Sequence, residues 1–265
     1  MASLAAYRAN QSYLYQRYSD RSSVTVFCDF DGPIVDVSDR YYNTYKLGLA
    51  EVQAVYAAEG KALPVHVLTK AQFWSMKQDR LPDPEIAMRS GLRGQQIELF
   101  LQRVTQIVNR PELLHQDRLQ PGVKWALTLL HAQGIRLALV TLRRQSQAIE
   151  ILQQQGLYHL FNQIHGAEDD QAAYRNQAEH KAQLLDAAIK QAVSESCLPF
   201  NPESAWMIGD TEADVLAGQT LGIQTIALLC GIRSRNYLQR FEPTLVQADL
   251  LSAVNYLIRS ACLAA

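Results

Sequence analysis

Aspartates in two distant segments are the side chains of this 265-residue chain whose type and spacing could do chemistry. Asp29 and Asp31 follow an apolar run near the N-terminus, and Asp210 and Asp214 stand in a second acidic segment. Carboxylates that converge on one place repel one another and raise each other's pKa. A hard divalent cation with oxygen ligands relieves that repulsion, and Mg²⁺ fits this description. The four aspartates therefore predict a magnesium site, provided that the fold brings them together.

Strands are the elements that would bring the aspartates together. Compact apolar runs are typical of buried parallel strands, and they occur at residues 24–30, 135–141, 205–210 and 224–230, with a weaker one at 161–165. Helical patterns alternate with them at residues 121–133, 147–155, 180–192, 213–221 and 248–258. In the first of these helices, Trp125, Leu129 and Leu130 are expected on one apolar face. The alternation predicts an α/β fold with a doubly wound parallel sheet.

The chemistry-bearing residues stand at the carboxyl ends of the predicted strands, where ligands bind in such sheets. Asp29, Asp31, Thr141 and Asp210 all occupy such ends. A single aspartate at a strand end often caps the following helix instead. Two acidic segments, DFDG and GDTEAD, at two strand ends favour one shared site over two unrelated caps.

The stretch from residue 37 to residue 117 has a different pattern. Helical segments at residues 41–58, 70–78, 84–90 and 95–108 follow one another with no convincing buried strand between them. This predicts a helical domain over 37–117, inserted after the first strand of an α/β core made of 1–36 and 118–265. The first twenty or so residues, which are polar and contain tyrosines, predict a short helix or a flexible lead-in.

The acidic segments also carry a resemblance. DFDGPI at residues 29–34 and GDTEADVLAG at residues 209–218 resemble motifs of the haloacid dehalogenase (HAD) superfamily. Thr141, which closes an apolar strand, is similar to the family's second motif, and Lys181, which opens a helix, is similar to its third. The resemblance covers about residues 24–36 and 118–260. It implies a Rossmann-like HAD core and makes the helical insertion a C1 cap.

The resemblance implies a role for each motif residue. Asp29 would be the nucleophile that forms an aspartyl-phosphate. Asp31 would be the general acid and base, and its backbone carbonyl would help to hold the metal. Thr141 and the amide of Leu142 would bind phosphate oxygens, and Lys181 would neutralise charge between the nucleophile and the phosphoryl group.

For the metal, the resemblance implies that Asp210 is a direct ligand of Mg²⁺ and that Asp214 supports it. Two departures from the family pattern stand near the site. Pro33 replaces the usual threonine, which removes a hydroxyl and a backbone donor. Lys181 lies in HKAQLL, without the Lys-Pro pair that is common in relatives.

Asp31 also separates branches of the family. By resemblance, phosphatases and phosphomutases have this aspartate, whereas members that cleave carbon–halogen bonds lack it. The overall likeness is to the phosphoglycolate phosphatase-like branch with a C1 cap. It implies an Mg²⁺-dependent phosphatase of small phosphorylated metabolites, because a closed lid leaves little space for macromolecules.

The residues that choose the substrate are open to two interpretations. In the first interpretation, aromatic and basic residues of the insertion face the core. In the second, the aromatic residues pack inside the insertion and Lys77 is a solvated helix residue. The residues concerned are Tyr41, Tyr42, Tyr45, Trp74 and Lys77. Arg143 and Arg144 directly follow the Thr141 motif. One of them could reach a substrate anion, or both could lie at an exposed helix start.

Composition limits the other classes of function. The net charge of −1 gives no sign of nucleic-acid binding, and the four cysteines are too scattered for a zinc ribbon. No run approaches the roughly 20 apolar residues of a membrane span, and no signal peptide is evident. These features predict a cytoplasmic monomer or homodimer with no nucleic-acid or membrane partner.

Two alternatives to the phosphatase remain. A phosphomutase of the β-phosphoglucomutase type uses the same core residues and differs only in passing the phosphoryl group to a sugar instead of water. A non-catalytic binding protein on the same fold is the other alternative, and the presence of all the motif residues argues against it.

Overall fold

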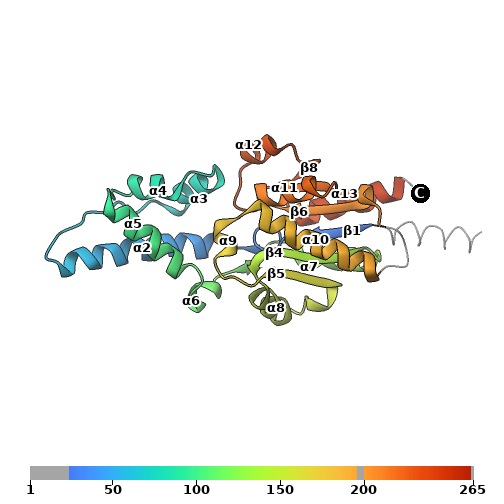
Figure 1. Ribbon diagram of the computed structural model, residues 1–265, viewed down its shortest axis with the longest axis horizontal. Coiled ribbons are helices and arrows are strands. Elements are labelled where there is room, and N and C mark those ends of the chain that lie inside the picture. The colour runs from blue at the N-terminus through green and yellow to red at the C-terminus, as the bar shows by residue number, and fades with distance from the viewer. Residues whose placement is uncertain (1–23, 196–199, 264–265) are drawn as a thin grey trace, which may run out of the picture.

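A computed structural model describes residues 24–195 and 200–263 of the chain (Figure 1). The tyrosine-containing N-terminal segment, with its predicted helix or lead-in, lies outside the described residues. No helix in the described ranges combines the length and the apolar character that crossing a membrane would require.

Six parallel strands form the main sheet in the order β5-β4-β1-β6-β7-β8, which confirms the predicted α/β class. Their bounds are β1 Thr25–Cys28, β4 Arg136–Arg144, β5 Gln163–Ala167, β6 Ala205–Gly209, β7 Gln224–Leu228 and β8 Leu245–Gln247. The chain passes from β1 to β4 and β5 on one side, and then crosses to β6 and β7 on the other. The carboxyl ends of β1, β4 and β6 therefore meet where the strand order reverses, which is the position of ligand sites in open α/β sheets.

Helices cover both faces of this sheet because alternate strand residues point to opposite faces. In β1, Val26 and Cys28 pack with helices α7 (Val123–Ala132), α8 (Gln145–Gln154) and α13 (Leu250–Leu263). Phe27, between them, packs on the other face with α10 (Ala178–Glu195) and α11 (Glu212–Thr220). Both faces are buried against helices, as the continuous apolar runs of the strands predict.

The predicted apolar face of α7 is wrong in part. Trp125 is 61% exposed, whereas Leu130 is fully buried and Leu129 is partly buried. The core-facing positions are instead Val123, Ala126, Leu127 and Leu130. These positions follow the i, i+3, i+4, i+7 spacing of one helix face, and Trp125 lies outside it.

The helices between residues 38 and 114 extend away from the sheet (Figure 1). They are α2 (Ser38–Ala58), α3 (Lys70–Gln78), α4 (Asp83–Arg89), α5 (Gln95–Ile107) and α6 (Pro111–Leu114). They share a separate hydrophobic cluster, in which the Tyr45 and Phe73 rings stack with centroids 4.9 Å apart. Gly48 lets α2 and α5 approach closely, since a Cβ there would lie 3.0 Å from Phe100.

A short antiparallel ribbon marks where the chain leaves the sheet region and returns. It pairs β2 (Val35–Asp36) with β3 (Arg118–Leu119). The remaining elements are short: helices α9 (Ala172–Arg175) and α12 (Arg235–Leu238), and single 3₁₀ turns at Tyr158–Leu160, Pro202–Ser204 and Gln239–Phe241.

Candidate active site

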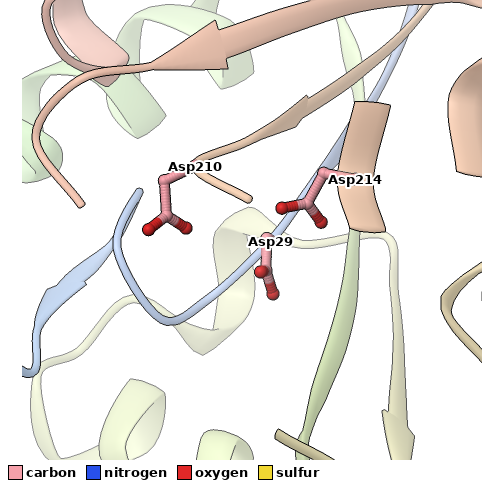
Figure 2. A group of neighbouring side chains, drawn as sticks. All are labelled: Asp29, Asp210 and Asp214. Atoms are coloured by element: carbon pink, nitrogen blue, oxygen red, sulfur yellow. The ribbon is translucent and has the colours of Figure 1, made fainter. Parts of the chain in front are cut away.

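Three buried carboxylates converge at the carboxyl ends of β1 and β6 (Figure 2). Asp29 directly follows β1, Asp210 directly follows β6, and Asp214 lies in the first turn of α11. Each offers one oxygen, and these oxygens lie within 4.8 Å of one another. Asp210 Oδ1 is buried and has no hydrogen-bond partner among the described residues. A cluster of acidic oxygens with an unpartnered acceptor fits a divalent cation.

Lys181 is the cation that faces this cluster. It lies in the first turn of α10, its side chain is 1% exposed, and its Nζ is 2.8 Å from Asp29 Oδ1 and 2.9 Å from Asp214 Oδ1. Burial by itself lowers the pKa of Lys181, but the carboxylates of Asp214 and Asp29 outweigh it and raise that pKa above its usual value. The lysine is therefore charged at any physiological pH.

One lysine does not balance three buried carboxylates. Burial raises the pKa of Asp29 to about 7, with a further contribution from Asp214, against the lowering effect of Lys181. Burial and the neighbouring Asp214 and Asp29 raise the pKa of Asp210 well above its ordinary range. Without a metal the cluster retains protons, and a bound divalent cation would replace them.

Glycines provide the space for these carboxylates. A Cβ on Gly209 would lie 2.1 Å from Asp214 Cγ, and one on Gly231 would lie 1.8 Å from Asp210 Oδ2. Gly32, in the turn after β1, has a φ of +93° and would place a Cβ 2.2 Å from Asp210 Cγ. Any side chain at these positions would displace an acidic group of the cluster.

The residues after β7 connect the cluster to the inserted helices. The backbone N–H of Ile232 donates to Asp210 Oδ2 (2.6 Å). Two residues later, the N–H of Ser234 donates to the carbonyl of Gln78 at the end of α3 (2.9 Å). Arg233, between them, donates to the carbonyl of Lys77 (3.3 Å). One short loop therefore contacts both the cluster and the insertion.

The predicted phosphate-binding residues line the same cavity as the carboxylates. Thr141 is buried within β4, and Thr141 and Leu142 share this cavity with Asp29 and Asp210. The strand continues through Arg144 instead of ending at residue 141, with a shift in register against β5 after Thr141. This irregularity lies where the strand passes the cavity.

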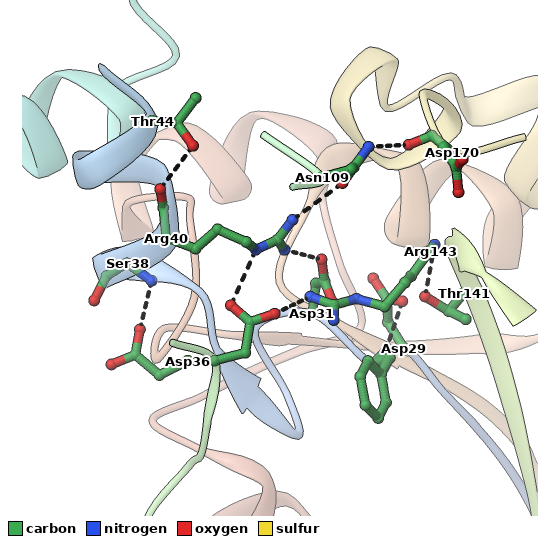
Figure 3. A network of polar contacts seen from close by, with 12 residues as sticks. Asp29, Asp31, Asp36, Ser38, Arg40, Thr44, Asn109, Thr141, Arg143 and Asp170 are labelled. Atoms are coloured by element: carbon green, nitrogen blue, oxygen red, sulfur yellow. Dashed lines mark hydrogen bonds and ion pairs between the residues drawn. The ribbon is translucent and has the colours of Figure 1, made fainter. Parts of the chain in front are cut away.

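Asp31 belongs to a different network, shown in Figure 3. Its Oδ1 lies 2.7 Å from Arg143 Nε, and its Oδ2 lies 3.0 Å from Arg40 Nη2. Asp117 pairs with the same two arginines, and its side chain is fully buried. Burial by itself would raise the pKa of Asp31. The positive charges of Arg143 and Arg40 lower this pKa by a larger amount, so it lies below its usual value. The side chain of Asp31 is therefore held as a carboxylate, outside the three-carboxylate cluster.

The sequence did not identify Arg40 and Asp117, since nothing in their spacing marks them. Arg143, which the sequence left open between the site and the surface, is 3% exposed and belongs to the site. The side chain of Arg144 is 50% exposed and pairs with Asp170.

The inserted helices close the cavity from the other side. Tyr41 of α2 and Lys77 of α3 line it, together with Asp83, Tyr174 and Arg233. The other insertion aromatics named from the sequence, Tyr42, Tyr45 and Trp74, belong to or pack against the insertion's hydrophobic cluster. The cavity volume is about 60 Å³, which is enough for a few water molecules.

Two known proteins are similar in sequence to about half of this chain. Pyrophosphatase PpaX of Halalkalibacterium halodurans is 30% identical over 146 residues, which are 53% of this chain and 63% of that protein. A phosphoglycolate phosphatase of Psychrobacter arcticus is 30% identical over 140 residues, which are 53% of this chain and 56% of that protein. The chain thus matches less than two thirds of the length of these curated relatives.

A solved structure shares the fold. A haloacid dehalogenase-like hydrolase of Streptococcus pneumoniae aligns with a TM-score of 0.58 at 21% identity, covering 89% of this chain and 98% of that one. The sequence model of the haloacid dehalogenase-like hydrolases matches residues 26–228, which include both acidic segments, Thr141 and Lys181. On this match, the chain belongs to the haloacid dehalogenase-like hydrolase family.

Proposed function

We propose that the protein is an Mg²⁺-dependent phosphatase that hydrolyses small phosphorylated metabolites through an aspartyl-phosphate on Asp29. The observation that most directly supports this proposal is a buried cluster that shares a cavity with Thr141. Its members are Asp29, Lys181, Asp210 and Asp214. Phosphoryl transfer needs positioned cations and an oriented nucleophile, which is what this cluster offers. The names of the relatives, a pyrophosphatase and a phosphoglycolate phosphatase, support the same class of reaction.

The contacts of Asp29 favour one of its oxygens as the nucleophile. Oδ1 accepts a hydrogen bond from the backbone N–H of Phe30 (2.7 Å) and lies against Lys181 Nζ. Oδ2 has no hydrogen-bond partner among the described residues. In the proposed first step, Oδ2 forms a bond to phosphorus while the bond from phosphorus to the leaving oxygen breaks. Oδ1 becomes the carbonyl oxygen of the aspartyl-phosphate, and Lys181 Nζ beside it would offset negative charge on the transferring phosphoryl group.

Asp31 is the proposed proton carrier. It would protonate the leaving oxygen in the first step and take a proton from water in the second, when water attacks the phosphorus and releases Asp29. Its ion pairs with Arg143 and Arg40 favour the ionised form, which acts as the base in the second step. The first step uses the protonated form, so Asp31 would take up a proton from solvent before it protonates the leaving oxygen. Thr141 and the amide of Leu142 would hold the phosphoryl oxygens.

The proposed Mg²⁺ would be held by Asp29, Asp210 and the backbone carbonyl of Asp31, with support from Asp214. When bound, it would supply positive charge that neutralises the phosphoryl oxygens. The fit rests on the three converging carboxylates and on the buried, unpartnered Asp210 Oδ1.

We also propose that residues 37–117 form a cap domain on a core of 1–36 and 118–265. Support comes from the insertion's separate hydrophobic cluster and from the β2–β3 ribbon at its two ends. A cap that closes the cavity would exclude water from the transferring group and would contact the rest of the substrate.

Magnesium should stabilise the protein more at about pH 8 than at about pH 5.5. The raised pKa values of Asp29 and Asp210 mean that the metal-free folded protein keeps protons that the unfolded chain has lost. Its stability therefore falls as the pH rises from about 4 towards 7. Magnesium binds the ionised carboxylates, so at low pH it must first displace protons. Thermal unfolding is measured in saturating Mg²⁺ and in EDTA. At about pH 8 the Tm in Mg²⁺ should be about 5 °C higher than the Tm in EDTA, and at about pH 5.5 the difference should be smaller. An equal Tm increase at both pH values would contradict this link between proton release and magnesium binding.

Phosphate release from a panel of phosphorylated metabolites tests the proposed function. It should require Mg²⁺, stop with EDTA, and disappear in Asp29→Asn. An isomeric sugar phosphate without free phosphate would instead identify the phosphomutase alternative. A folded, Mg²⁺-binding protein that changes none of the panel would favour the binding protein.

A further inference from the structure

Asp117 has a fully buried side chain and does not line the active-site cavity. Its two oxygens pair with different arginines: Oδ1 lies 3.0 Å from Arg40 Nε, and Oδ2 accepts a hydrogen bond from Arg143 Nη2. Burying a carboxylate is costly unless opposite charge and hydrogen bonds compensate for it. The side chains of both arginines are only 2% exposed, so this compensation is buried as well. Any effect of Asp117 on the reaction must therefore pass through these two arginines.

The same two arginines hold Asp31 (Figure 3), so the four side chains form a closed ring of ion pairs. Arg143 uses Nε for Asp31 and Nη2 for Asp117, whereas Arg40 uses Nη2 for Asp31 and Nε for Asp117. Each of the four carboxylate oxygens accepts one of these bonds. A guanidinium donates from a rigid planar fork. Rotation of the Asp31 carboxylate would break its contacts with both arginines, so the ring fixes its orientation.

The ring meets the cavity at Asp31. Its side chain is 18% exposed, whereas the side chains of the two arginines and of Asp117 are nearly or fully buried. Two positive and two negative charges balance within the ring. Apolar packing is often at least as stable as a buried network of this kind. Stability alone therefore gives little reason for four charged groups behind the one carboxylate that the article's proposed reaction uses as a proton carrier.

The ring also joins separate parts of the chain. Arg40 lies in the first turn of α2, Asp117 directly precedes β3, and Arg143 lies in β4. The backbone N–H of Arg143 donates to Thr141 Oγ1 (3.0 Å). One residue thus contacts both the Asp31 carboxylate and the proposed phosphate-binding hydroxyl, which fixes the two groups relative to each other.

We propose that Asp117 is a positioning residue, which acts through its two arginines to hold the Asp31 carboxylate in the orientation that proton transfer to the leaving oxygen requires. This inference rests on the proposed function. In its first step, Asp29 Oδ2 forms a bond to phosphorus, the bond from phosphorus to the leaving oxygen breaks, and the proton of Asp31 passes to that oxygen. A misplaced Asp31 slows this step only when the leaving oxygen needs a proton.

Two small substrates of similar size test this role. Ethyl phosphate releases an alkoxide that must be protonated, whereas acetyl phosphate releases acetate, which leaves without a proton. The measured quantity is kcat/KM after subtraction of uncatalysed hydrolysis, because it covers the steps up to transfer of the phosphoryl group to Asp29. Asp117→Asn should lower kcat/KM for ethyl phosphate by about 10- to 100-fold, within the range that a general acid contributes, and kcat/KM for acetyl phosphate by less than about threefold.

Asp36→Asn is the matched control. Asp36 lies on β2 opposite Arg118, the residue that follows Asp117, and it forms no ion pair within residues 24–195 and 200–263. Its Oδ1 accepts a hydrogen bond from the Ser38 N–H (2.8 Å), and asparagine keeps an acceptor there. The ratio of kcat/KM for the two substrates should stay at the wild-type value.

A double variant separates positioning from charge balance. Asp117→Asn alone leaves two buried arginines opposite one carboxylate, which can impair folding. Adding Arg40→Gln restores neutrality and leaves Arg143 paired with Asp31. The double variant should therefore unfold at a higher temperature than Asp117→Asn, but it should still discriminate against ethyl phosphate by about 10- to 100-fold more than the wild type does. If Asp117→Asn does not fold, the double variant decides.

The outcomes distinguish this inference from the proposed function. An equal loss on both substrates in Asp117→Asn, or a wild-type ratio in the double variant, would overturn the positioning role while leaving the phosphatase standing. If the wild type does not accept ethyl phosphate, the best alkyl phosphate of the metabolite panel replaces it. Mg²⁺-dependent phosphate release from none of these compounds would overturn the proposed function, and this inference with it.

Discussion

Asp29→Asn should lower phosphate release by at least about 10,000-fold, the scale of loss that follows deletion of a nucleophile. An amide in place of the carboxylate cannot form the aspartyl-phosphate, although it keeps nearly the same shape and can still accept hydrogen bonds from the Phe30 N–H and Lys181. Release is measured with the preferred substrate at saturating Mg²⁺. Activity within tenfold of the wild type would exclude Asp29 as the nucleophile.

The same variant should be more stable than the wild type in EDTA. Burial raises the pKa of Asp29 to about 7, which means that ionisation of this carboxyl opposes folding. A neutral side chain removes that cost, and the gain should be larger at about pH 8 than at about pH 5 because the folded wild type is protonated at the lower pH. Asp39→Asn is the control, since Asp39 is exposed on α2 and should change neither activity nor stability measurably.

Lys181→Met should destabilise the protein by about 3–5 kcal/mol at about pH 8, the cost of removing one partner from a buried ion pair. Lys181 is 1% exposed and is the cation in contact with Asp29 and Asp214, so its loss leaves both carboxylates buried without compensation. Activity should also fall by about 100- to 1,000-fold, because a charge that faces the transferring group is lost. Urea unfolding and phosphate release measure the two effects.

The loss of stability should depend on pH and on metal. At about pH 5 Asp29, whose pKa burial raises to about 7, is protonated, so the destabilisation should shrink. Saturating Mg²⁺ should restore part of it at about pH 8. Lys190→Met is the matched control on the same helix: its side chain is 75% exposed and pairs with Asp186, so its replacement should cost less than about 0.5 kcal/mol. If Lys181→Met is as stable as Lys190→Met, the charge balance described for the cluster is wrong.

The elements with a strong local signal could be predicted from the sequence. The strand at β1 is an apolar run bounded by acidic residues and Gly32, and α3 has the same bounds as the predicted helical segment. The edge strand β8 was missed because its three residues are only partly buried and too few to show a pattern. The predicted position of Trp125 on the apolar face of α7 is wrong, because an apolar side chain does not have to be buried and single exposed aromatics are common on surfaces.

The residues of the site also fall into two groups, those that the sequence could predict and those that it could not. Asp29, Asp210 and Asp214 carry their spacing in two short motifs, so the sequence could place them in one cluster. The network around Asp31 has no such signal, because Arg40 reaches Asp117 across 77 positions of the chain. A contact of that kind depends on how the inserted helices sit on the sheet, which local patterns do not encode.

The loop after β7 is expected to couple cation binding at Asp210 to the position of helix α3. Ile232 holds the Asp210 carboxylate, and Ser234 holds the end of α3. A cation held by Asp210, as proposed above, would also fix the loop that donates a hydrogen bond to the end of α3. By reciprocity, whatever displaces α3 from that loop weakens cation binding by the same factor. If the proposed cation site exists, metal affinity measured with and without a bound substrate should therefore report on the position of α3.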